Sequence, residues 1–395
     1  MNDIIIIFYP RFTLELKIHK DDLLDALNFL SSIVERRHSI SILSNVKCQL
    51  SDKELVLTGS DLEIQTVVRL ELNGECITPG ETTIPFRKLY DICKSLPNEA
   101  MIKLENSDNR CLLQCNKSKF TISTLSALDY PLINLGQRNV LEVNIQQGHL
   151  KTAFDKVAFS MAVNDVRFYL TGTLLEVKQN SLKAITTDGH RLSCAEVPSE
   201  CPNYENALVQ RHIIAPKKAV MELNKLMTQP DQTVNLKFCP DFLSCSLDYK
   251  LKSGKTICVE VTSKLIDGKF PDYERVIPRD TNKVANIDTS AFKQALQRVA
   301  ILSNEKLRSV SLSFTQDNLT INGQNTENDE AKEELSIGYQ NDDITISFNA
   351  QYLIDIVNTL NSQEVEMCMS EDTRSTLVMA KSDASTLFVV MPMRV

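Results

Sequence analysis

The segment G-H-L-K-T-A-F-D-K-V at 148–157 decides the fold, because its pattern occurs three times in the chain. The related segments are D-D-L-L-D-A-L-N-F-L at 21–30 and S-A-F-K-Q-A-L-Q-R-V at 290–299. In each copy apolar residues recur at i, i+3, i+4 and i+7, the spacing of an amphipathic helix. The apolar positions are Leu23, Ala26, Leu27, Leu30; Leu150, Ala153, Phe154, Val157; and Phe292, Ala295, Leu296, Val299.

Further landmarks follow each of these helices in a constant order. A strand and turn occupy 54–61, 181–188 and 318–325, and a strand leads into a second helix at 83–96, 212–226 and 346–360. Each copy ends in a strand pair that includes 119–125, 255–261 or 385–391. The same interval of 127 residues separates Ala26 from Ala153 and Asp61 from Asp188. Ordered landmarks at near-constant spacing favour a true repeat over three unrelated α+β domains that are alike by chance.

The repeat predicts an α+β fold of three domains, each with two helices packed on antiparallel sheets. Short alternating runs such as 46–50 have the period of half-buried antiparallel strands, and roughly eight of them fit in each copy. We expect domains at 13–138, 139–280 and 281–395, preceded by an N-terminal extension at 1–12 of unknown structure. A chain of 395 residues is long enough for two or three such cores.

The composition is that of a soluble globular protein, with 43% apolar and 24% charged residues. The 11 cysteines form no C-x-x-C pair, so we expect reduced, mostly buried thiols and neither a metal site nor a disulfide framework. The apolar run at 4–8 lacks a basic leader and is too short to span a bilayer. These features predict a cytoplasmic protein.

The net charge of −8 does not indicate nucleic-acid binding, so binding to DNA would require positive charge that is concentrated on one surface. The six predicted helices, 21–33, 86–96, 149–160, 215–227, 291–302 and 350–360, carry +3 in sum, which leaves −11 for the rest. On charge alone, solvated helix faces explain such a small excess better than a basic lining does. A weakly basic lining would suit loose contact with phosphates, without readout of bases.

Three strings identify a family resemblance: A-I-T-T-D-G-H-R-L-S at 184–193, F-P-D-Y-E-R-V-I-P at 270–278 and F-V-V-M-P-M-R-V at 388–395. Together with 165–172 and 300–306, they resemble the bacterial β sliding clamps, the β subunit of DNA polymerase III. The resemblance runs in order from about residue 12 to the end of the chain. It implies that three clamp domains form half of a closed ring, with helices inside and sheets outside.

The resemblance further implies a head-to-tail homodimer that encircles duplex DNA without sequence preference. Such a ring tethers the replicative polymerase catalytic subunit, the clamp loader, translesion polymerases and repair proteins through short linear motifs. It confers processivity and has no cofactor and no catalysis of its own. Positions that match the family's DNA-contact residues are Arg37, Asn164, Arg167, Phe168 and Tyr169. Taken individually, these are equally well explained as ordinary exposed loop residues.

The family's pocket for client peptides lies between the second and third domains. The matching residues are Leu170, Thr187, Gly189, His190, Arg191, Leu192, Pro271, Val276, Asn349, Tyr352, Ser375, Val389, Met391, Pro392, Met393 and Arg394. Leu, Val, Pro and Met provide an apolar slot for a client's Leu or Phe, and Met adapts to varied side chains. His190, Arg191 and Arg394 would supply a polar rim. From pattern alone, 389–393 is also typical of a buried terminal strand.

The resemblance also implies the ring interface. Phe120 and Ile122 of one chain would meet Ile301 and Leu302 of the other. Lys117 and Lys119 would face an acidic cluster that consists of Glu327, Asp329, Glu330, Glu333 and Glu334. We expect the apolar contacts to supply most of the affinity and the charges to set the pairing.

The sequence departs from the family at three places. The loop at 38–43 lacks the prolines that the family often has, Thr373 stands where an apolar residue often lines the pocket, and residues 1–12 precede the usual start.

Two rival functions stay open. A hydrolase would use Asp188, His190, Ser193 and Cys194, but residues so close in sequence cannot all converge on one reacting atom. No G-x-S-x-G, Walker or G-x-G-x-x-G motif is present. A scaffold that binds peptides without DNA is the better alternative, and it would not need a closed ring.

Overall fold

The computed structural model describes residues 14–134, 140–205, 212–304, 307–370 and 375–393. The chain divides into two compact units. Unit 1 contains residues 1–140 and 234–264, and unit 2 contains residues 141–233 and 265–395. The predicted extension at 1–12 lies outside the described residues.

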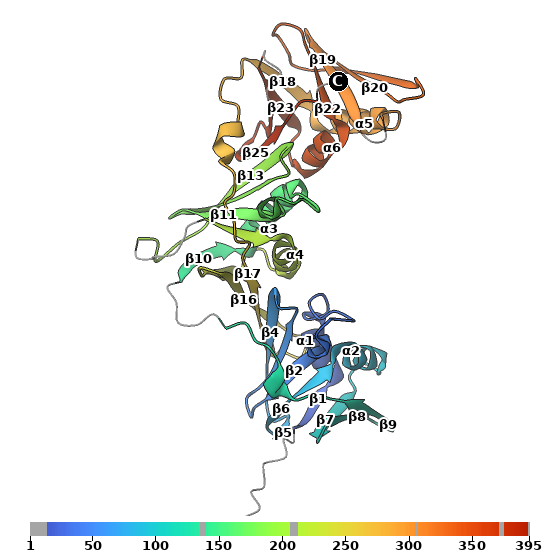
Figure 1. Ribbon diagram of the computed structural model, residues 1–395, viewed down its shortest axis with the longest axis vertical. Coiled ribbons are helices and arrows are strands. Elements are labelled where there is room, and N and C mark those ends of the chain that lie inside the picture. The colour runs from blue at the N-terminus through green and yellow to red at the C-terminus, as the bar shows by residue number, and fades with distance from the viewer. Residues whose placement is uncertain (1–13, 135–139, 206–211, 305–306, 371–374, 394–395) are drawn as a thin grey trace, which may run out of the picture. The chain divides into compact units, whose positions relative to one another are not determined.

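Unit 1 combines two helices with two antiparallel sheets (Figure 1). The helices are α1 Lys20–Asn28 and α2 Phe86–Ser95, and they contact each other. One sheet has the order β5-β1-β7-β8-β9, built from Cys76–Thr78, Leu14–His19, Met101–Ser107, Arg110–Cys115 and Ser118–Ser123. The other has neighbours in the order β15-β16-β17-β4-β3-β2-β6, built from Thr233–Phe238, Phe242–Lys250, Thr256–Lys264, Ile64–Glu71, Glu54–Ser60, Asn45–Leu50 and Gly80–Pro85.

This second sheet explains why unit 1 includes residues 234–264, which the repeat assigns to the second domain. Strand β17 pairs with β4 in an antiparallel ladder that runs from Ile257 opposite Leu70 to Ser263 opposite Ile64. The sheet therefore continues from one repeat into the next. The domain boundaries near 138 and 280 stay a prediction, because compactness follows the sheets and not the repeats.

A buried ion-pair cluster holds the β16–β17 turn of unit 1 against α1. Lys255 contacts Glu75 and lies 3.3 Å from Asp22, and the side chains are 10%, 15% and 5% exposed, respectively. Burial raises the pKa of Glu75, but the hydrogen bond from Lys255, two backbone hydrogen bonds and the positive charge of Lys255 together outweigh it, so this pKa is lowered. The rings of Phe29 and Tyr249 pack 4.8 Å apart and add an apolar contact.

Unit 2 contains four helices within its described residues: α3 Gln147–Val157, α4 Lys217–Leu226, α5 Thr289–Ala300 and α6 Ala350–Thr359. Helix α3, which follows β10 Leu141–Gln146, contacts α4, and α5 contacts α6. A sheet with the order β21-β20-β19-β22 consists of Glu330–Ser336, Asn318–Gln324, Ser309–Thr315 and Ile344–Asn349.

The larger sheet of unit 2 joins strands from the second and third repeats. Its order is β14-β11-β12-β13-β25-β24-β23-β18, built from His212–Pro216, Gly172–Val177, Ser181–Thr187, Arg191–Pro198, Asp383–Val390, Thr376–Ala380, Glu364–Met369 and Lys283–Asp288. The junction is the antiparallel pair β13–β25, which runs from Arg191 opposite Val390 to Ala195 opposite Thr386. This junction brings the two repeats together at the predicted pocket.

The structure confirms the α+β class and all six predicted helices, and the three apolar stripes are buried. Helix α1 ends at Asn28, before the predicted end at residue 33. Its apolar pattern continues because Leu30, Ile33 and Val34 are buried in the turns that follow. Nine of the 11 cysteines are buried, which confirms that expectation, and Cys76 and Cys258 are half-buried. No helix among the described residues has the length and apolar character needed to cross a bilayer.

The Lys255 cluster predicts a pH-dependent stability. Because folding lowers the pKa of Glu75 from 4.5, its stabilising contribution is present above that value and is lost as pH falls through the folded pKa. We expect Lys255→Met to lower the free energy of unfolding at neutral pH by about 3–5 kcal/mol, since it leaves buried carboxylates without a cation. The deficit should shrink when urea unfolding is repeated at acid pH.

The matched control is Lys264→Met. Lys264 is 45% exposed and lies 3.8 Å from Glu63, so its loss should change stability by at most about 1 kcal/mol. A Lys255→Met deficit that is equal at neutral and acid pH would contradict the role of this cluster.

Candidate functional site

Predicted pocket residues from both repeats meet in one apolar cluster of unit 2. Leu170, Leu192 and Val389 are buried in it, and Val276 packs against it. They come from the 3-10 helices η4 Phe168–Leu170 and η5 Tyr273–Val276 and from β13 and β25. Leu192 lies directly opposite Val389 in the β13–β25 ladder. The cluster forms the buried apolar floor of the predicted pocket.

A hollow of about 950 Å³ opens beside this floor. Arg275, Val276 and Arg279 line it from η5 and the segment that follows, and Ser375 lines it from the start of the β24 region. The hydroxyl of Ser375 donates to the carbonyl of Val276 at 3.0 Å. Val276 therefore borders both the apolar cluster and the hollow. Most of its lining is polar or charged and includes Asp272, Glu274 and Asp280, so the hollow is a polar recess that meets the apolar cluster at Val276 and Ile277.

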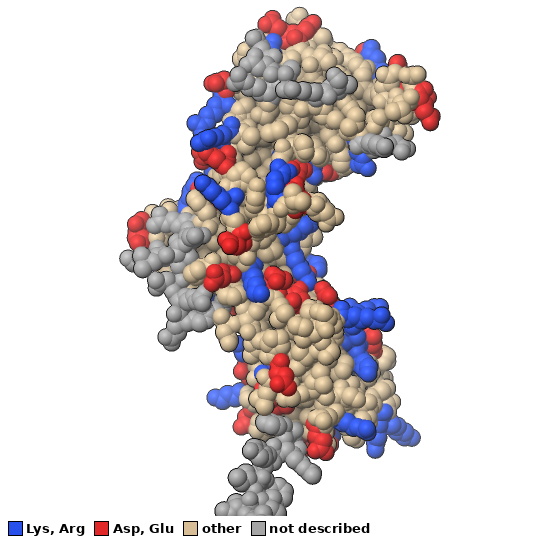
Figure 2. Space-filling model, in the orientation of Figure 1, with Lys and Arg blue, Asp and Glu red and all other residues tan. Residues whose placement is uncertain are grey.

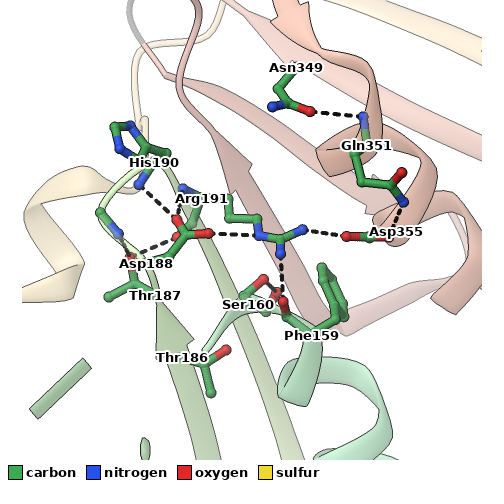
Figure 3. Close-up of polar contacts among 12 residues, drawn as sticks. Phe159, Ser160, Thr186, Thr187, Asp188, His190, Arg191, Asn349, Gln351 and Asp355 are labelled. Atoms are coloured by element: carbon green, nitrogen blue, oxygen red, sulfur yellow. Dashed lines mark hydrogen bonds and ion pairs between the residues drawn. The ribbon is translucent and has the colours of Figure 1, made fainter. Parts of the chain in front are cut away.

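The turn between β12 and β13 forms one wall of the site (Figure 3). Gly189 adopts a φ of +91°, which favours glycine. The Asp188 carboxylate accepts hydrogen bonds from the backbone N–H groups of His190, at 2.9 Å, and Arg191, at 3.0 Å. The Thr187 hydroxyl accepts from the Gly189 N–H at 3.0 Å and donates to the Arg191 carbonyl at 2.7 Å. The string T-D-G-H-R thus fixes its own turn.

The C-terminal segment lies along this turn. The N–H of Met391 donates to the carbonyl of His190 at 2.9 Å, and the N–H of Met393 donates to the carbonyl of Ser347 at 2.8 Å. Met391 is 37% exposed, whereas Val389 is only 1% exposed. The segment therefore leaves the buried strand and reaches the surface beside the pocket, where Met side chains can adapt to a ligand.

Arg191 lies inside this wall and not on its rim (Figure 3). Its side chain is 11% exposed. Nε donates to Asp188 at 3.0 Å, Nη1 to Asp355 at 2.6 Å, and Nη2 to the carbonyl of Phe159 at 2.6 Å. The guanidinium also lies 4.4 Å from the ring centroid of Tyr352 and 5.2 Å from that of Phe159. The predicted rim role therefore finds no support for Arg191.

The structure describes several of the other predicted pocket residues. His190 and Pro271 are exposed, so His190 is available for the polar rim. Asn349 caps the N-terminus of α6 with its side chain. Arg394 and Thr373 lie outside the described residues.

The predicted DNA-contact residues of unit 2 lie around η4. Asn164, Arg167 and Phe168 are exposed, Tyr169 is half-buried, and Asn164 has a φ of +55°. Arg167 forms a two-pronged ion pair with Asp165, at 3.0 and 2.7 Å. The hydrogen bonds from Arg167 lower the pKa of Asp165 to about 2. This arginine is therefore already paired within the chain.

Arg167 also touches the pocket turn. It donates to the carbonyl of Asp188 at 3.2 Å, and a Cβ at Gly189 would lie 3.1 Å from its Nη1. In unit 1, Arg37 is exposed. The neighbouring segment at 38–43 includes most of the 3-10 helix η1 Ser41–Ser44.

Two outer strands carry the predicted interface residues. In unit 1, β9 is the outer strand of its sheet, with Lys119 exposed and Phe120 half-buried, and Lys117 is exposed just before it. Ile122 is only 3% exposed and packs inside unit 1, so Phe120 is the apolar group on this strand that a partner could reach.

In unit 2, β21 is one of the two outer strands of its sheet, and Ile301 is 77% exposed at the end of α5. Leu302 is half-buried, and the exposed acids are Glu327, Asp329, Glu330 and Glu334. Glu333 instead pairs with Arg298 of α5 at 2.7 and 2.9 Å, which lowers the pKa of Glu333.

The four residues of the hydrolase hypothesis form no reactive group. The Asp188 carboxylate accepts hydrogen bonds from backbone N–H groups of the turn, and the His190 side chain is exposed. The Ser193 hydroxyl is buried, 2.6 Å from the Ser160 hydroxyl. Burial raises the pKa of the Cys194 thiol to about 12. No pair of nucleophile and base arises from this arrangement.

Sequence reasoning missed Phe270, Tyr273 and Asp355. Phe270 and Tyr273 belong to the apolar cluster, and the Tyr273 hydroxyl donates to Glu176 at 2.7 Å. Their aromatic side chains within the string at 270–278 were an available signal. No local sequence signal pointed to Asp355, because 164 residues separate it from its partner Arg191.

Three family models match the chain in order. They are the N-terminal domain of the DNA polymerase III beta subunit at 14–134, its central domain at 144–272 and its C-terminal domain at 274–394.

Characterised relatives and solved structures agree with these models. The beta sliding clamp of Pseudomonas putida is 38% identical over 95% of this chain and 99% of its own length, and that of Escherichia coli K12 is 36% identical over 97% and 100%. The crystal structure of the beta subunit from Pseudomonas aeruginosa matches with a TM-score of 0.89 at 36% identity and covers 96% of this chain and all of its own. A sliding clamp from the same species bound to griselimycin matches with a TM-score of 0.88 at 37% identity over 97% of this chain and all of its own. The chain therefore belongs to the family of DNA polymerase III beta subunits, the beta sliding clamps.

Proposed function

We propose that this protein encircles duplex DNA as a head-to-tail homodimer and tethers replication and repair proteins to it. Beyond family membership, one observation carries the proposal: two outer strands, β9 and β21, bear opposite charge. An outer strand offers backbone N–H and C=O groups with which a second strand can pair. A head-to-tail contact between different surfaces generates a closed ring when its rotation closes.

The chemistry of the two strands is complementary. Lys117 and Lys119 accompany β9, whereas Glu330 and Glu334 lie on β21. In the proposed dimer, Phe120 of one chain packs against Ile301 and Leu302 of the other. Exposed ion pairs contribute about 0–1 kcal/mol each, so the apolar contact supplies most of the affinity. The charges favour the head-to-tail pairing and speed encounter.

Contact with DNA is weak and electrostatic in this proposal. Figure 2 shows Lys and Arg side chains on the side of unit 1 where Figure 1 draws α1 and α2, and Lys88 and Lys94 of α2 are exposed. In unit 2, Lys156, Lys225 and Arg298 are already in ion pairs within the chain. Because the ring itself retains the DNA, few phosphate contacts suffice, and the clamp remains free to slide.

The pocket of unit 2 binds client peptides. Its apolar floor receives a client's Leu or Phe, and Met391 and Met393 adapt to different clients. The clients are the replicative polymerase catalytic subunit, the clamp loader, translesion polymerases and repair proteins. The protein works in the bacterial cytoplasm as a processivity subunit, without a cofactor or catalysis. A scaffold that does not encircle DNA is the alternative.

Retention on nicked circular DNA, after loading by a clamp loader with ATP, tests the ring. We expect the protein to stay on circles and to leave once a cut creates ends, because a topological link needs closed DNA. Retention on circles should change little between about 50 and 200 mM salt, whereas contact binding falls steeply. Equal retention on circular and linear DNA would refute encirclement and favour the contact mode.

The interface is tested by Ile301→Asp, which places a charge in an apolar contact. Light scattering should then give the mass of one chain, 44.5 kDa, where the wild type gives twice that mass. Met221→Asp is the control, because Met221 is 42% exposed on α4 and belongs to neither outer strand. A dimer that survives Ile301→Asp would show that the chains associate through another surface.

The pocket is tested by deletion of the chain from Met391 onward. We expect loss of binding to a labelled peptide that ends in Leu-Phe, while the mass of the dimer persists, because the deletion removes one wall of the pocket and neither outer strand. The Ile301→Asp variant should show the converse, with peptide binding kept and the dimer lost. Undiminished peptide affinity in the deletion variant would place the pocket elsewhere.

A further inference from the structure

We infer that Asp355 is a positioning residue for client peptides that acts through Arg191 on Tyr352, an inference that rests on the proposed function. Asp355 lies on α6, and its side chain is 23% exposed. One carboxylate oxygen accepts from Arg191 at 2.6 Å, and the other accepts from the Gln351 side chain at 2.7 Å (Figure 3). Both oxygens are thus engaged within the chain, so Asp355 acts on a ligand indirectly.

Arg191 joins three segments that lie far apart in sequence. Its partners are Asp188 in the β12–β13 turn, the carbonyl of Phe159 in the 3-10 helix η3 Ala158–Ser160, and Asp355 on α6. The first two belong to the second repeat, and only Asp355 belongs to the third. The guanidinium keeps its two partners in the second repeat when Asp355 is removed, but it loses its charged link to α6. Asp355 therefore determines how firmly the turn is held against α6.

In this inference Tyr352, a half-buried residue of the predicted pocket that packs against the core around α5 and α6, carries the link to a bound peptide. It precedes Asp355 by three residues, so the two side chains lie on the same face of α6. The Arg191 guanidinium lies 4.4 Å from the centroid of the Tyr352 ring. A carboxylate that fixes the guanidinium also fixes the ring packed against it. A ring already held in place lowers the entropic cost of ordering it when a peptide binds.

The chain offers a matched control for this ion pair. Lys156 of α3 donates to Asp383 of β25 at 2.6 Å and to Thr386 at 2.8 Å. This pair has the same length and also joins the second repeat to the third. It lies at the start of β25, whereas the pocket lies at the end, near Val389. Asp383→Ala therefore removes a comparable link without touching the pocket.

The test measures peptide affinity and the thermal midpoint of the full-length protein. The probe is a fluorescein-labelled peptide that ends in Leu-Phe, followed by anisotropy. We expect Asp355→Ala to weaken binding by about tenfold, the loss of roughly one charge-assisted hydrogen bond. Asp383→Ala should lower the midpoint without changing affinity. Asp355→Asn keeps an oxygen that can accept from Arg191 and should restore most of the affinity.

A double-mutant cycle decides whether Asp355 acts through Tyr352. In a Tyr352→Ala background, Asp355→Ala should add little further loss, because coupled residues are not additive. Additive losses, or the same loss of affinity from Asp355→Ala and Asp383→Ala, would overturn the inference and leave the proposed function intact. Failure of the wild-type protein to bind the peptide would overturn the proposed function and the inference with it.

Discussion

The pairing of β13 with β25 is the interaction on which the rest of the candidate site depends. It joins Arg191 to Val390 and Leu192 to Val389, residues from different repeats. Because side chains alternate along a strand, a slip of one residue would turn Val389 away from the apolar cluster. The same register carries the chain end to the surface, where Met391 bonds to the carbonyl of His190. One ladder thus sets both the floor of the pocket and one of its edges.

Several basic side chains of this protein form ion pairs within the chain. Arg191 holds the pocket wall together, Arg167 pairs with Asp165, and Arg298 pairs with Glu333. Lys255 in turn secures α1 against the β16–β17 turn. Basic groups that are satisfied in this way contribute less to phosphate binding than their number implies. This arrangement suits a protein that remains on DNA by encirclement, since tight phosphate contacts would oppose sliding.

The sheets explain how three repeats form two compact units. Strand β17 extends the sheet of the first repeat, and β13 pairs with β25 of the third repeat. Each junction is a ladder of backbone hydrogen bonds, one within unit 1 and one within unit 2. The strands β9 and β21 remain at the outside of their sheets. The proposed ring therefore uses the same kind of interaction between chains that the structure uses within one chain.

The sequence by itself determined the repeat, the helices and the family. The apolar stripe of Phe292, Ala295, Leu296 and Val299 is local information, because helix spacing and burial follow from neighbouring residues. The string that contains Thr187 and Gly189 likewise specified its own turn. Composition also indicated buried thiols, and nine of the 11 cysteines are buried.

Only the tertiary structure decided which of the matched residues are buried and which are exposed. It placed Arg191 inside the wall, Ile122 inside unit 1, and Asp355 against a guanidinium 164 residues away. No local pattern encodes such contacts, because they arise when strands and helices from separate repeats pack together. For the same reason, the repeat did not predict the division into units 1 and 2. Long-range backbone pairing, and not the boundary of a repeated sequence, determines what packs with what.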